Sequence, residues 1–420
     1  MTQSNAPAAP IGRPLAGLRV VEAGIALSGP FCASLLADFG ASVIKVERRD
    51  GGDPARLLGP QVDHVSLWWG VMARDKQCAT LDLKAEADRG RFLKLVAEAD
   101  VLVENYRPGV MERLGLGWDT LSACNPGLIV MSISGFGQTG PDAKRPGFGK
   151  IAEGLSGIVP LTGRPGDAPL HVGFSLADTS AGLMGCMAIN MALLDRERNG
   201  GRGARIDVAL YEPLLRMAEL QLALRESAGV TPQRSGSNDP YCWGADPQWG
   251  ANNEYGRRYV AAACRDGHKI LVRVDAASAA AVAALAGAVP GSVAATLDAA
   301  LRAWAGTQEV EAAGALLRAQ GIEAARIHDG LSLARSKYFL ARGDVQTTSD
   351  PVSGALAVPG QLPLRAPRSG LTAFHAAQVG EHNAAVFGGE VHPAAAGRQR
   401  SDPAGSAAET LPRVEPSQIR

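Results

Sequence analysis

An aspartate set among small residues is the first candidate for chemistry in this chain. Asp178 stands in the run Leu176-Ala177-Asp178-Thr179-Ser180-Ala181-Gly182, at the start of an expected long helix. A carboxylate at such a position commonly caps the N-terminus of the helix, and this structural interpretation stays open. Capping does not require small neighbours, whereas a carboxylate that must reach a bulky substrate does. The pattern therefore also fits a carboxylate nucleophile.

Alternating strands and helices must position such a residue. Apolar runs predict strands at 18–23, 41–46, 80–83, 101–103, 128–133 and 206–210, and helices are expected at 29–39, 85–99 and 176–195. Strands separated by helices of this length pair in parallel through right-handed crossovers, which predicts an α/β fold with a Rossmann-like open sheet. Ligands bind at the carboxyl ends of the strands in such sheets, so the candidate binding loops are Gly24–Pro30, Glu47–Asp53 and Glu104–Gly109.

The rest of the chain predicts a second, smaller part. Residues 228–258 are loop-like, 258–274 predict a hairpin around Asp266-Gly267, and 276–320 predict helices rich in Ala and Leu. The organisation we expect is a disordered N-terminus (1–14), a large Rossmann-like domain (15–224), a small α+β domain (225–335), a segment that returns to the large domain (336–388) and a disordered tail (389–420).

Composition excludes several classes of protein. The 420 residues carry 42 Lys+Arg and 42 Asp+Glu, so no basic surplus exists to neutralise a nucleic-acid backbone. The six cysteines are scattered without a CxxC pair, which favours free thiols in a reducing cytoplasm over a metal site or a disulfide framework. We expect a cytoplasmic protein without a signal peptide or membrane span. Glycine, at 50 residues, exceeds the usual ~7% and indicates many tight turns.

The common cofactor and hydrolase fingerprints are absent. Where a dinucleotide-binding GxGxxG would follow the first strand, the chain has Gly24-Ile25-Ala26-Leu27-Ser28-Gly29-Pro30. It also has no P-loop GxxxxGK[ST], no zinc-binding HExxH and no GxSxG elbow of a serine hydrolase. These absences disfavour a nicotinamide enzyme, a nucleoside triphosphatase and a serine hydrolase.

An ordered series of motifs resembles the family III CoA-transferases, which include formyl-CoA transferase and the crotonobetaine and bile-acid CoA-transferases. The matching segments are 35–47, 51–56, 80–84, 100–109, 134–141 and 176–182; the similarity runs from about Leu15 to Pro213 and continues more weakly through 321–343 to about His382. This resemblance implies that Asp178 is the nucleophile, forming an aspartyl-acyl anhydride and then an aspartyl-CoA thioester. It implies a coenzyme A thioester as substrate and no permanently bound metal or cofactor.

The resemblance also implies which residues contact CoA: Leu27, Ser28, Arg48, Leu81, Lys84, Asn105, Tyr106 and Arg113. Taken alone, each of the three cations fits a solvated surface charge, but their shared position at strand ends favours an anion site. Asn105 also fits an Asx turn before Pro108. The family further implies an interlocked dimer, with a heteromer left open, and places acceptor specificity in the segment Tyr241–Tyr255, whose Trp, Asn and Pro content disfavours formate or oxalate.

Other functions remain as alternatives. An acyl-CoA racemase of the same superfamily needs a histidine opposite the aspartate, expected near 146–150, where the chain has Pro146-Gly147-Phe148-Gly149-Lys150. A catalytically silent CoA-binding subunit of a heteromeric transferase is a second alternative, disfavoured by the presence of Asp178. A plain binding module is a third.

Overall fold

The structure is a computed structural model that describes residues 13–232, 234, 236, 258–289, 291–292, 294–350, 354–363 and 375–388. The segment expected to govern acceptor specificity, Tyr241–Tyr255, and the tail expected to be disordered, 389–420, lie outside the described residues. The same holds for residues 1–12 of the expected disordered N-terminus.

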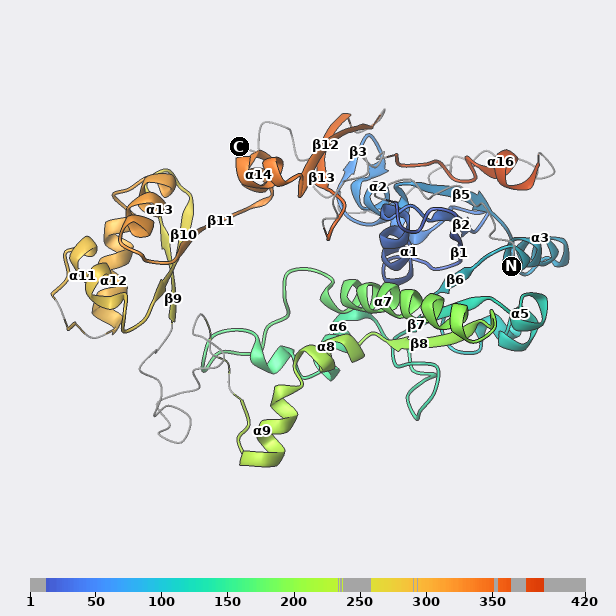
Figure 1. Cartoon of the computed structure of the whole chain (residues 1–420), viewed down its shortest axis with the longest axis horizontal. Helices are drawn as coiled ribbons and strands as arrows, with labels where there is room; N and C mark the ends of the chain where they lie inside the picture. The colour runs from blue at the N-terminus through green and yellow to red at the C-terminus, as the bar shows by residue number, and fades with distance from the viewer. Residues whose placement is uncertain are drawn as a thin grey trace, which may run out of the picture.

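A six-stranded parallel sheet forms the centre of the molecule (Figure 1). Its strands are β1 (Arg19–Glu22), β2 (Ser42–Glu47), β5 (Lys76–Thr80), β6 (Val101–Glu104), β7 (Ile129–Ser134) and β8 (Ala204–Ala209). Their spatial order is β5-β2-β1-β6-β7-β8, and each neighbouring pair is parallel. Numbered along the chain this order is 3-2-1-4-5-6, the doubly wound Rossmann arrangement. The predicted fold class is confirmed.

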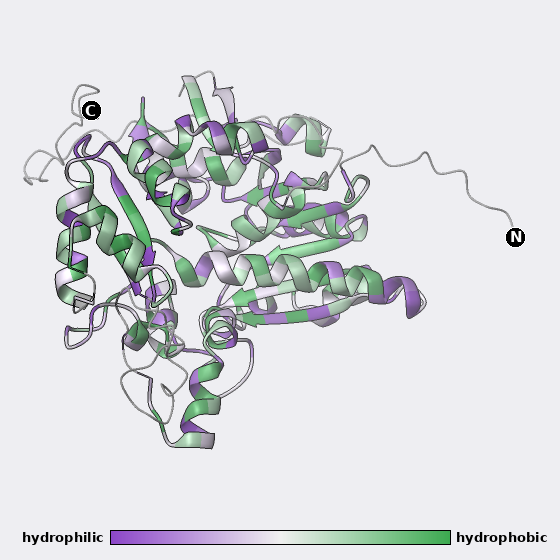
Figure 2. Cartoon of the chain, turned by 60° about the vertical axis from the view of Figure 1, so that its left-hand side comes forward, coloured by the Kyte–Doolittle hydropathy of each residue, from purple (hydrophilic) through white to green (hydrophobic). Residues whose placement is uncertain are grey.

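Helices cover both faces of this sheet. On one face α1 (Ser28–Asp38) and α7 (Leu176–Arg198) share a buried apolar cluster with Val20 of β1; on the other, α3 (Glu86–Ala97) and α5 (Trp118–Cys124) share one with Val21. Adjacent residues of β1 serve opposite faces because side chains alternate along a strand. The central strands β6 and β7 are accordingly mostly hydrophobic, as expected of a parallel sheet buried on both sides. Figure 2 shows both hydrophobic and hydrophilic segments along the strands of the sheet.

The third strand of the sheet begins earlier than its sequence predicts. A strand was expected at 80–83, whereas β5 spans Lys76–Thr80. The polar run Lys76-Gln77-Cys78 hides the strand from a hydrophobicity pattern, because the Lys76 ammonium is buried against Glu22 Oε2 at 2.7 Å. Leu81 belongs to the loop that follows, so the carboxyl end of β5 lies directly before it.

A three-stranded antiparallel sheet forms a separate, smaller core. Its order is β11-β10-β9, from β9 (Arg258–Ala263), β10 (Lys269–Val274) and β11 (Ala324–Ile327). The β9–β10 pair confirms the hairpin predicted around Asp266-Gly267. Three helices pack on this sheet: α11 (Ala279–Ala286), α12 (Ala294–Ala305) and α13 (Val310–Ala319). Figure 1 shows this part, in yellow and orange, set apart from the six-stranded sheet.

The chain then returns to the large sheet. The next elements are α14 (Gly330–Arg335), α15 (Lys337–Arg342) and the antiparallel pair β12 (Val345–Asp350) and β13 (Gly354–Pro359). The last described element, α16 (Asn383–Phe387), lies beside edge strand β5 (Figure 1). Asn383 Oδ1 accepts a hydrogen bond from Thr80 N at 2.8 Å, and Asn383 Nδ2 donates to Thr80 Oγ1 at 3.0 Å. The last described helix is thereby fixed to the edge of the sheet.

The remaining elements are short connections. They are η1 (Pro54–Leu57), β3 (Gln61–Val62), β4 (Val65–Ser66), α2 (Leu67–Ala73), α4 (Val110–Arg113), α6 (Gly149–Leu155), η2 (Val159–Leu161), α8 (Glu212–Met217) and α9 (Leu220–Ala228). Within the described residues, α7 is long and apolar enough to cross a membrane by length and composition alone. Its contacts with α1, β7 and β8 are those of a helix packed on a protein core.

Candidate active site

The carboxyl ends of neighbouring parallel strands bring the predicted CoA-binding residues to one edge of the sheet. Leu27 and Ser28 follow β1, Arg48 follows β2, Leu81 and Lys84 follow β5, and Asn105, Tyr106 and Arg113 follow β6. The chain order reverses between β1 and β6, where an open sheet forms its ligand crevice. The turn after β1 and the loop after β6 flank that point.

Asn105 shapes the turn after β1. Its Oδ1 accepts from Ile25 N at 2.7 Å, and its Nδ2 donates to Ile25 O at 2.8 Å and to Ser28 Oγ at 3.1 Å. A Cβ at Gly24 or Gly29 would lie 3.3 Å from the Asn105 amide group, so the close approach favours glycine at both positions. The Asn105 side chain is therefore committed to the turn that carries Leu27 and Ser28.

A buried ion pair that the sequence did not indicate holds the same turn. The Lys45 ammonium, only 1% exposed, contacts Glu22 Oε1 at 2.7 Å, Asp53 Oδ2 at 2.6 Å and the carbonyl oxygen of Gly24. Asp53 Oδ1 in turn accepts from Ala26 N at 2.9 Å. Ala26 has a φ of +60°, which is unfavourable for a residue with a side chain, so this hydrogen bond supports a strained conformation. Charge pairing lowers the pKa of Asp53 despite its burial.

The three candidate phosphate-binding cations are exposed. Arg48 reaches only the Gly52 carbonyl oxygen, at 3.4 Å, Lys84 makes its hydrogen bonds through its backbone, and the Arg113 guanidinium lies over Gly109. None of the three forms an ion pair within the described part of the chain. Their charges are thus available to an anionic ligand.

Two other candidates, Leu81 and Tyr106, are less exposed than these cations. Leu81 is buried in the core shared with α3, so only its backbone faces the strand end. Tyr106 is half-buried, and burial raises the pKa of its phenol; its backbone N–H donates to Glu104 Oε2 at 2.7 Å.

Asp178 lies in the first turn of α7 without capping it. The N-cap position is Ser175, so the capping interpretation of Asp178 is wrong. A Cβ at Gly149, the first residue of α6, would overlap Asp178 Oδ2, which places the carboxylate directly against the backbone of α6. One turn further along α7, a Cβ at Gly182 would lie 2.8 Å from Phe31 Cδ1 and 3.0 Å from Ser28 O. The aspartate is therefore one helical turn from the start of α1, where the predicted CoA contacts begin.

Burial makes Asp178 an unusually basic carboxylate. Desolvation is the largest cause, and the negative charge of Glu153 adds to it; the backbone N–H of Asp178 and the charge of Lys150 act in the opposite direction. Together these effects raise the pKa of Asp178 to about 6. It is still ionised at neutral pH, and a more basic carboxylate is the better nucleophile.

Two charged side chains that act on Asp178, and a histidine that contacts one of them, were not singled out as site residues in the sequence. Lys150 and Glu153 of α6 form an ion pair at 3.0 Å, and His171 Nδ1 lies 2.8 Å from Glu153 Oε2. The spacing of Lys150 and Glu153, three residues apart on a helix, is a signal for such a pair. His171 lies 18 residues after Glu153, so no local spacing rule predicts the contact between them.

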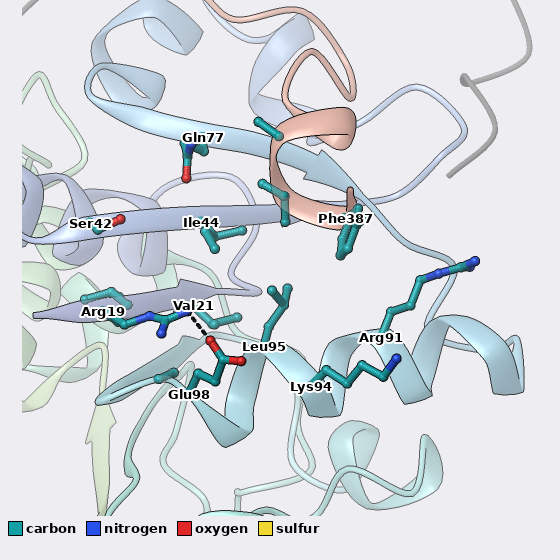
Figure 3. Close-up of a pocket in the computed structure, with 14 residues that line it drawn as sticks. Arg19, Val21, Ser42, Ile44, Gln77, Arg91, Lys94, Leu95, Glu98 and Phe387 are labelled. Atoms are coloured by element: carbon teal, nitrogen blue, oxygen red, sulfur yellow. Dashed lines mark hydrogen bonds and ion pairs between the residues drawn. The ribbon is translucent and has the colours of Figure 1, made fainter. Parts of the chain in front are cut away.

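A pocket of about 430 Å³ lies elsewhere on the sheet. It is lined by Arg19 and Ser42, the first residues of β1 and β2, by Gln77, and by side chains of α3 and α16, among them Lys94, Leu95 and Phe387 (Figure 3). These positions lie at the amino ends of the strands, whereas the candidate CoA residues follow their carboxyl ends. The two sites are therefore distinct.

No group of three or more His, Cys, Asp or Glu side chains among the described residues has the geometry to hold a metal ion. The five described cysteines, Cys32, Cys78, Cys124, Cys186 and Cys264, are free thiols. The chemistry that the described site offers is thus that of a basic carboxylate beside a glycine-bearing backbone and near exposed cations.

Known proteins share this sequence and architecture. The family model of CoA-transferase family III matches residues 15–383. A succinyl-CoA–D-citramalate CoA-transferase of Chloroflexus aurantiacus is 34% identical over 385 residues, covering 89% of this chain and 93% of that enzyme. The beta subunit of a succinyl-CoA–L-malate CoA-transferase from the same organism is 46% identical over 208 residues, 49% of this chain and 51% of that subunit. A solved CaiB/BaiF family protein from Brucella suis superposes with a TM-score of 0.78 at 29% identity, over 89% of this chain and 98% of that one. The chain belongs to CoA-transferase family III.

Proposed function

We propose that this CoA-transferase moves coenzyme A between two carboxylic acids with Asp178 as its covalent nucleophile. An Asp178 carboxylate oxygen attacks the thioester carbonyl of the donor, the C–S bond breaks, and an aspartyl-acyl anhydride and CoA thiolate result. The thiolate attacks Cγ of Asp178 and releases the donor acid, leaving an aspartyl-CoA thioester. The acceptor carboxylate attacks that thioester and expels CoA thiolate, which then attacks the acceptor carbonyl of the second anhydride and frees Asp178.

The position and basicity of Asp178 support this sequence of steps. Its carboxylate is partly desolvated, which strengthens its attack and limits access of water to an anhydride. Backbone N–H groups near Gly149, where no side chain intervenes, are the donors we assign to the developing oxyanions. Each step exchanges one activated carbonyl for another, so the scheme requires neither ATP nor a redox cofactor.

We propose a short dicarboxylic acid as acceptor and succinyl-CoA as donor. The relatives that support this choice are named as succinyl-CoA–D-citramalate, succinyl-CoA–L-malate and succinate–glutarate CoA-transferases. A relative named as an acetyl-CoA:oxalate CoA-transferase is 43% identical over 57% of this chain, so oxalate belongs in the test panel. We assign Arg48, Lys84 and Arg113 to the phosphates of CoA because their charges are unpaired in the described part of the chain.

We propose that the working form is a homodimer in the cytoplasm. Four apolar side chains of α7, each at least half exposed, form one stripe at intervals of three or four residues: Leu183, Met187, Met191 and Leu194. A continuous apolar stripe of this length is typical of a surface that a partner covers. Because one relative is named as a subunit of a two-subunit transferase, a heteromer is the alternative outcome.

Covalent trapping tests the proposed nucleophile. The protein is incubated with succinyl-CoA, release of succinate is followed, and hydroxylamine then converts an aspartyl thioester or anhydride into a hydroxamate that peptide mass spectrometry locates. We expect the hydroxamate on Asp178 and none in Asp178→Asn. Transfer activity retained by Asp178→Asn would overturn the proposal.

The same preparation separates the alternatives. A racemase exchanges the α-hydrogen of a 2-methylacyl-CoA with deuterium and transfers no CoA to an acceptor acid. A silent subunit binds succinyl-CoA without forming a hydroxamate. Either result in the wild-type protein would replace the transferase mechanism proposed here.

A further inference from the structure

The nucleophile is bordered by a charged cluster that the proposed mechanism does not use. Glu153 of α6 is only 1% exposed, and its carboxylate is held by two partners. Lys150 Nζ lies 3.0 Å from its Oε1 and 3.1 Å from its Oε2, and His171 Nδ1 lies 2.8 Å from Oε2. A buried carboxylate is costly unless it is paired, so the cluster is a built feature of the site.

Lys150 connects α6 to the segment that leads into α7. Besides Glu153, its ammonium donates to Val172 O at 2.9 Å and to Phe174 O at 2.7 Å. Phe174 O also accepts from the backbone N–H of Leu176, the first residue of α7, at 2.9 Å. The three N–H bonds of the ammonium are thereby used within the protein. Lys150 therefore forms a fixed link between α6 and the segment before α7, and this link is the strut referred to below. Its side chain is nevertheless 46% exposed.

The strut begins one residue from the tightest contact of Asp178. Gly149 brings the backbone of α6 against the Asp178 carboxylate, and Lys150 is the next residue of the same helix. The other end of the strut holds Phe174, four residues before Asp178. The Lys150 ammonium therefore links the backbone of α6, on one side of Asp178, to the segment before α7, on its other side.

We propose that Lys150, anchored by Glu153, is a positioning residue that holds Asp178 in its orientation for attack on the thioester. This inference rests on the proposed role of Asp178 as nucleophile. Reacting atoms must be held about 3–3.5 Å apart and aligned, and a misplacement of about 1 Å costs up to 10²-fold in rate. A strut that fixes α6 to the start of α7 sets that alignment, because Asp178 lies between its two ends.

Removal of the ammonium tests the strut. In Lys150→Met we expect a 10- to 100-fold lower rate of succinate release from succinyl-CoA with L-malate as acceptor, and a KM for succinyl-CoA changed less than about threefold. Lys150→Arg restores part of the rate, since guanidinium keeps charge and donors. Lys144→Met is the matched control: this lysine is exposed in the loop before α6 and makes no side-chain hydrogen bond or ion pair within the described residues. A wild-type rate in Lys150→Met, or a loss confined to KM, would overturn the proposal.

Glu153→Gln gives a second, independent readout. Glutamine keeps an oxygen for Lys150 but removes the negative charge that Asp178 senses. The charged groups that act on Asp178 are Glu153 and Lys150 of α6, and His171 reaches Glu153 from the preceding segment. We expect the acidic limb of the succinate-release rate to move to lower pH in this variant, and the plateau rate to fall less than in Lys150→Met because the amide oxygen still accepts from Lys150.

The two variants also cover a failure to fold. If Lys150→Met does not fold, Lys150→Arg and Glu153→Gln carry the test: wild-type plateau rates in both overturn the proposal, and lowered plateau rates at an unchanged KM support it. Failure of the proposed function has a different signature, since Asp178→Asn would then release succinate at the wild-type rate. The two hypotheses are thereby tested separately.

Discussion

At the scale of single residues, the central feature is an aspartate whose pKa is raised to about 6, mainly by burial. Only the ionised carboxylate attacks a thioester, so the rate of succinate release from succinyl-CoA, which follows that attack, should rise with pH through an apparent pKa near 6 and level off above pH 7. Quenched-flow measurement of succinate across pH 4.5–8.5 measures this rate. A limb centred near pH 4, the ordinary range of an aspartate, would contradict it.

The same shift predicts a trend in stability. The folded protein holds the Asp178 proton more tightly than the unfolded chain, whose aspartates titrate near 3.9. Stability is therefore lost as pH rises from about 4 to 6, and the full penalty is present above pH 6. Asp178→Asn should unfold at higher denaturant concentration than wild type at pH 8, by on the order of 1–2 kcal/mol, and the difference should vanish near pH 4. Urea titrations at the two pH values decide this.

Gly149 is the other residue that the site cannot exchange. A methyl group there would overlap Asp178 Oδ2, so Gly149→Ala must displace the nucleophile. We expect a loss of at least 100-fold in the rate of hydroxamate formation, with a far-UV spectrum like that of wild type. Gly154→Ala is the control on the same helix, because its Cβ would enter open space. Equal activities of the two variants would show that the contact is unimportant.

The residues also show what a sequence can and cannot predict about this site. Asp178 and the strand-end cations follow from motifs in a fixed order, and the structure brings their elements to one sheet edge. The roles of Lys45, Asp53 and Glu153 did not follow, because each depends on a partner that only the folded chain supplies. A buried lysine in a strand is indistinguishable in sequence from a solvated one.

At the scale of elements, the turn after β1 depends on a loop that follows β2. Asp53 accepts the N–H of Ala26 at 2.9 Å and faces Lys45 at 2.6 Å. In Asp53→Asn an amide N–H₂ or a weaker acceptor meets the Lys45 ammonium, so the turn loses support. We expect the KM for succinyl-CoA to rise about tenfold while the maximal rate of succinate release changes less than about threefold. Steady-state kinetics give both parameters.

Asp50→Asn serves as its control, since Asp50 is exposed in the same loop. A KM increase in both variants would point to the charge of the loop rather than to the support of the turn.

Most strands of the six-stranded sheet and three of its helices could be located from sequence, and the exception among the strands has a physical cause. The periodicity of α1, α3 and α7 and the apolar runs of β1, β2, β6 and β7 predicted their positions to within a few residues. For β5 the prediction was wrong because the strand begins with Lys76, whose charge is neutralised inside the sheet by Glu22. Hydrophobicity patterns assume that charged residues face water, and a buried ion pair breaks that assumption.

At the scale of the whole molecule, the exposed stripe of α7 is the feature that a single chain leaves unexplained. Met187→Glu places a charge in the middle of that stripe, and we expect a dimer in wild type and a chain of 43.6 kDa in the variant. Size-exclusion chromatography with light scattering measures both masses. Val289→Glu, at another exposed apolar residue outside α7, should leave the mass unchanged. A wild-type monomer would exclude the homodimer.

The return of the chain to its first domain has a consequence for biosynthesis. Asn383, 303 residues later in the chain, forms hydrogen bonds with Thr80 of edge strand β5. The strand that Leu81 and Lys84 follow is therefore covered only once α16, near the end of the described chain, is in place. A nascent chain that has emerged as far as residue 230 already contains every strand of the CoA-binding sheet but exposes the outer edge of β5. The outer edge of β5 therefore stays uncovered for the whole time needed to translate the small sheet and its helices.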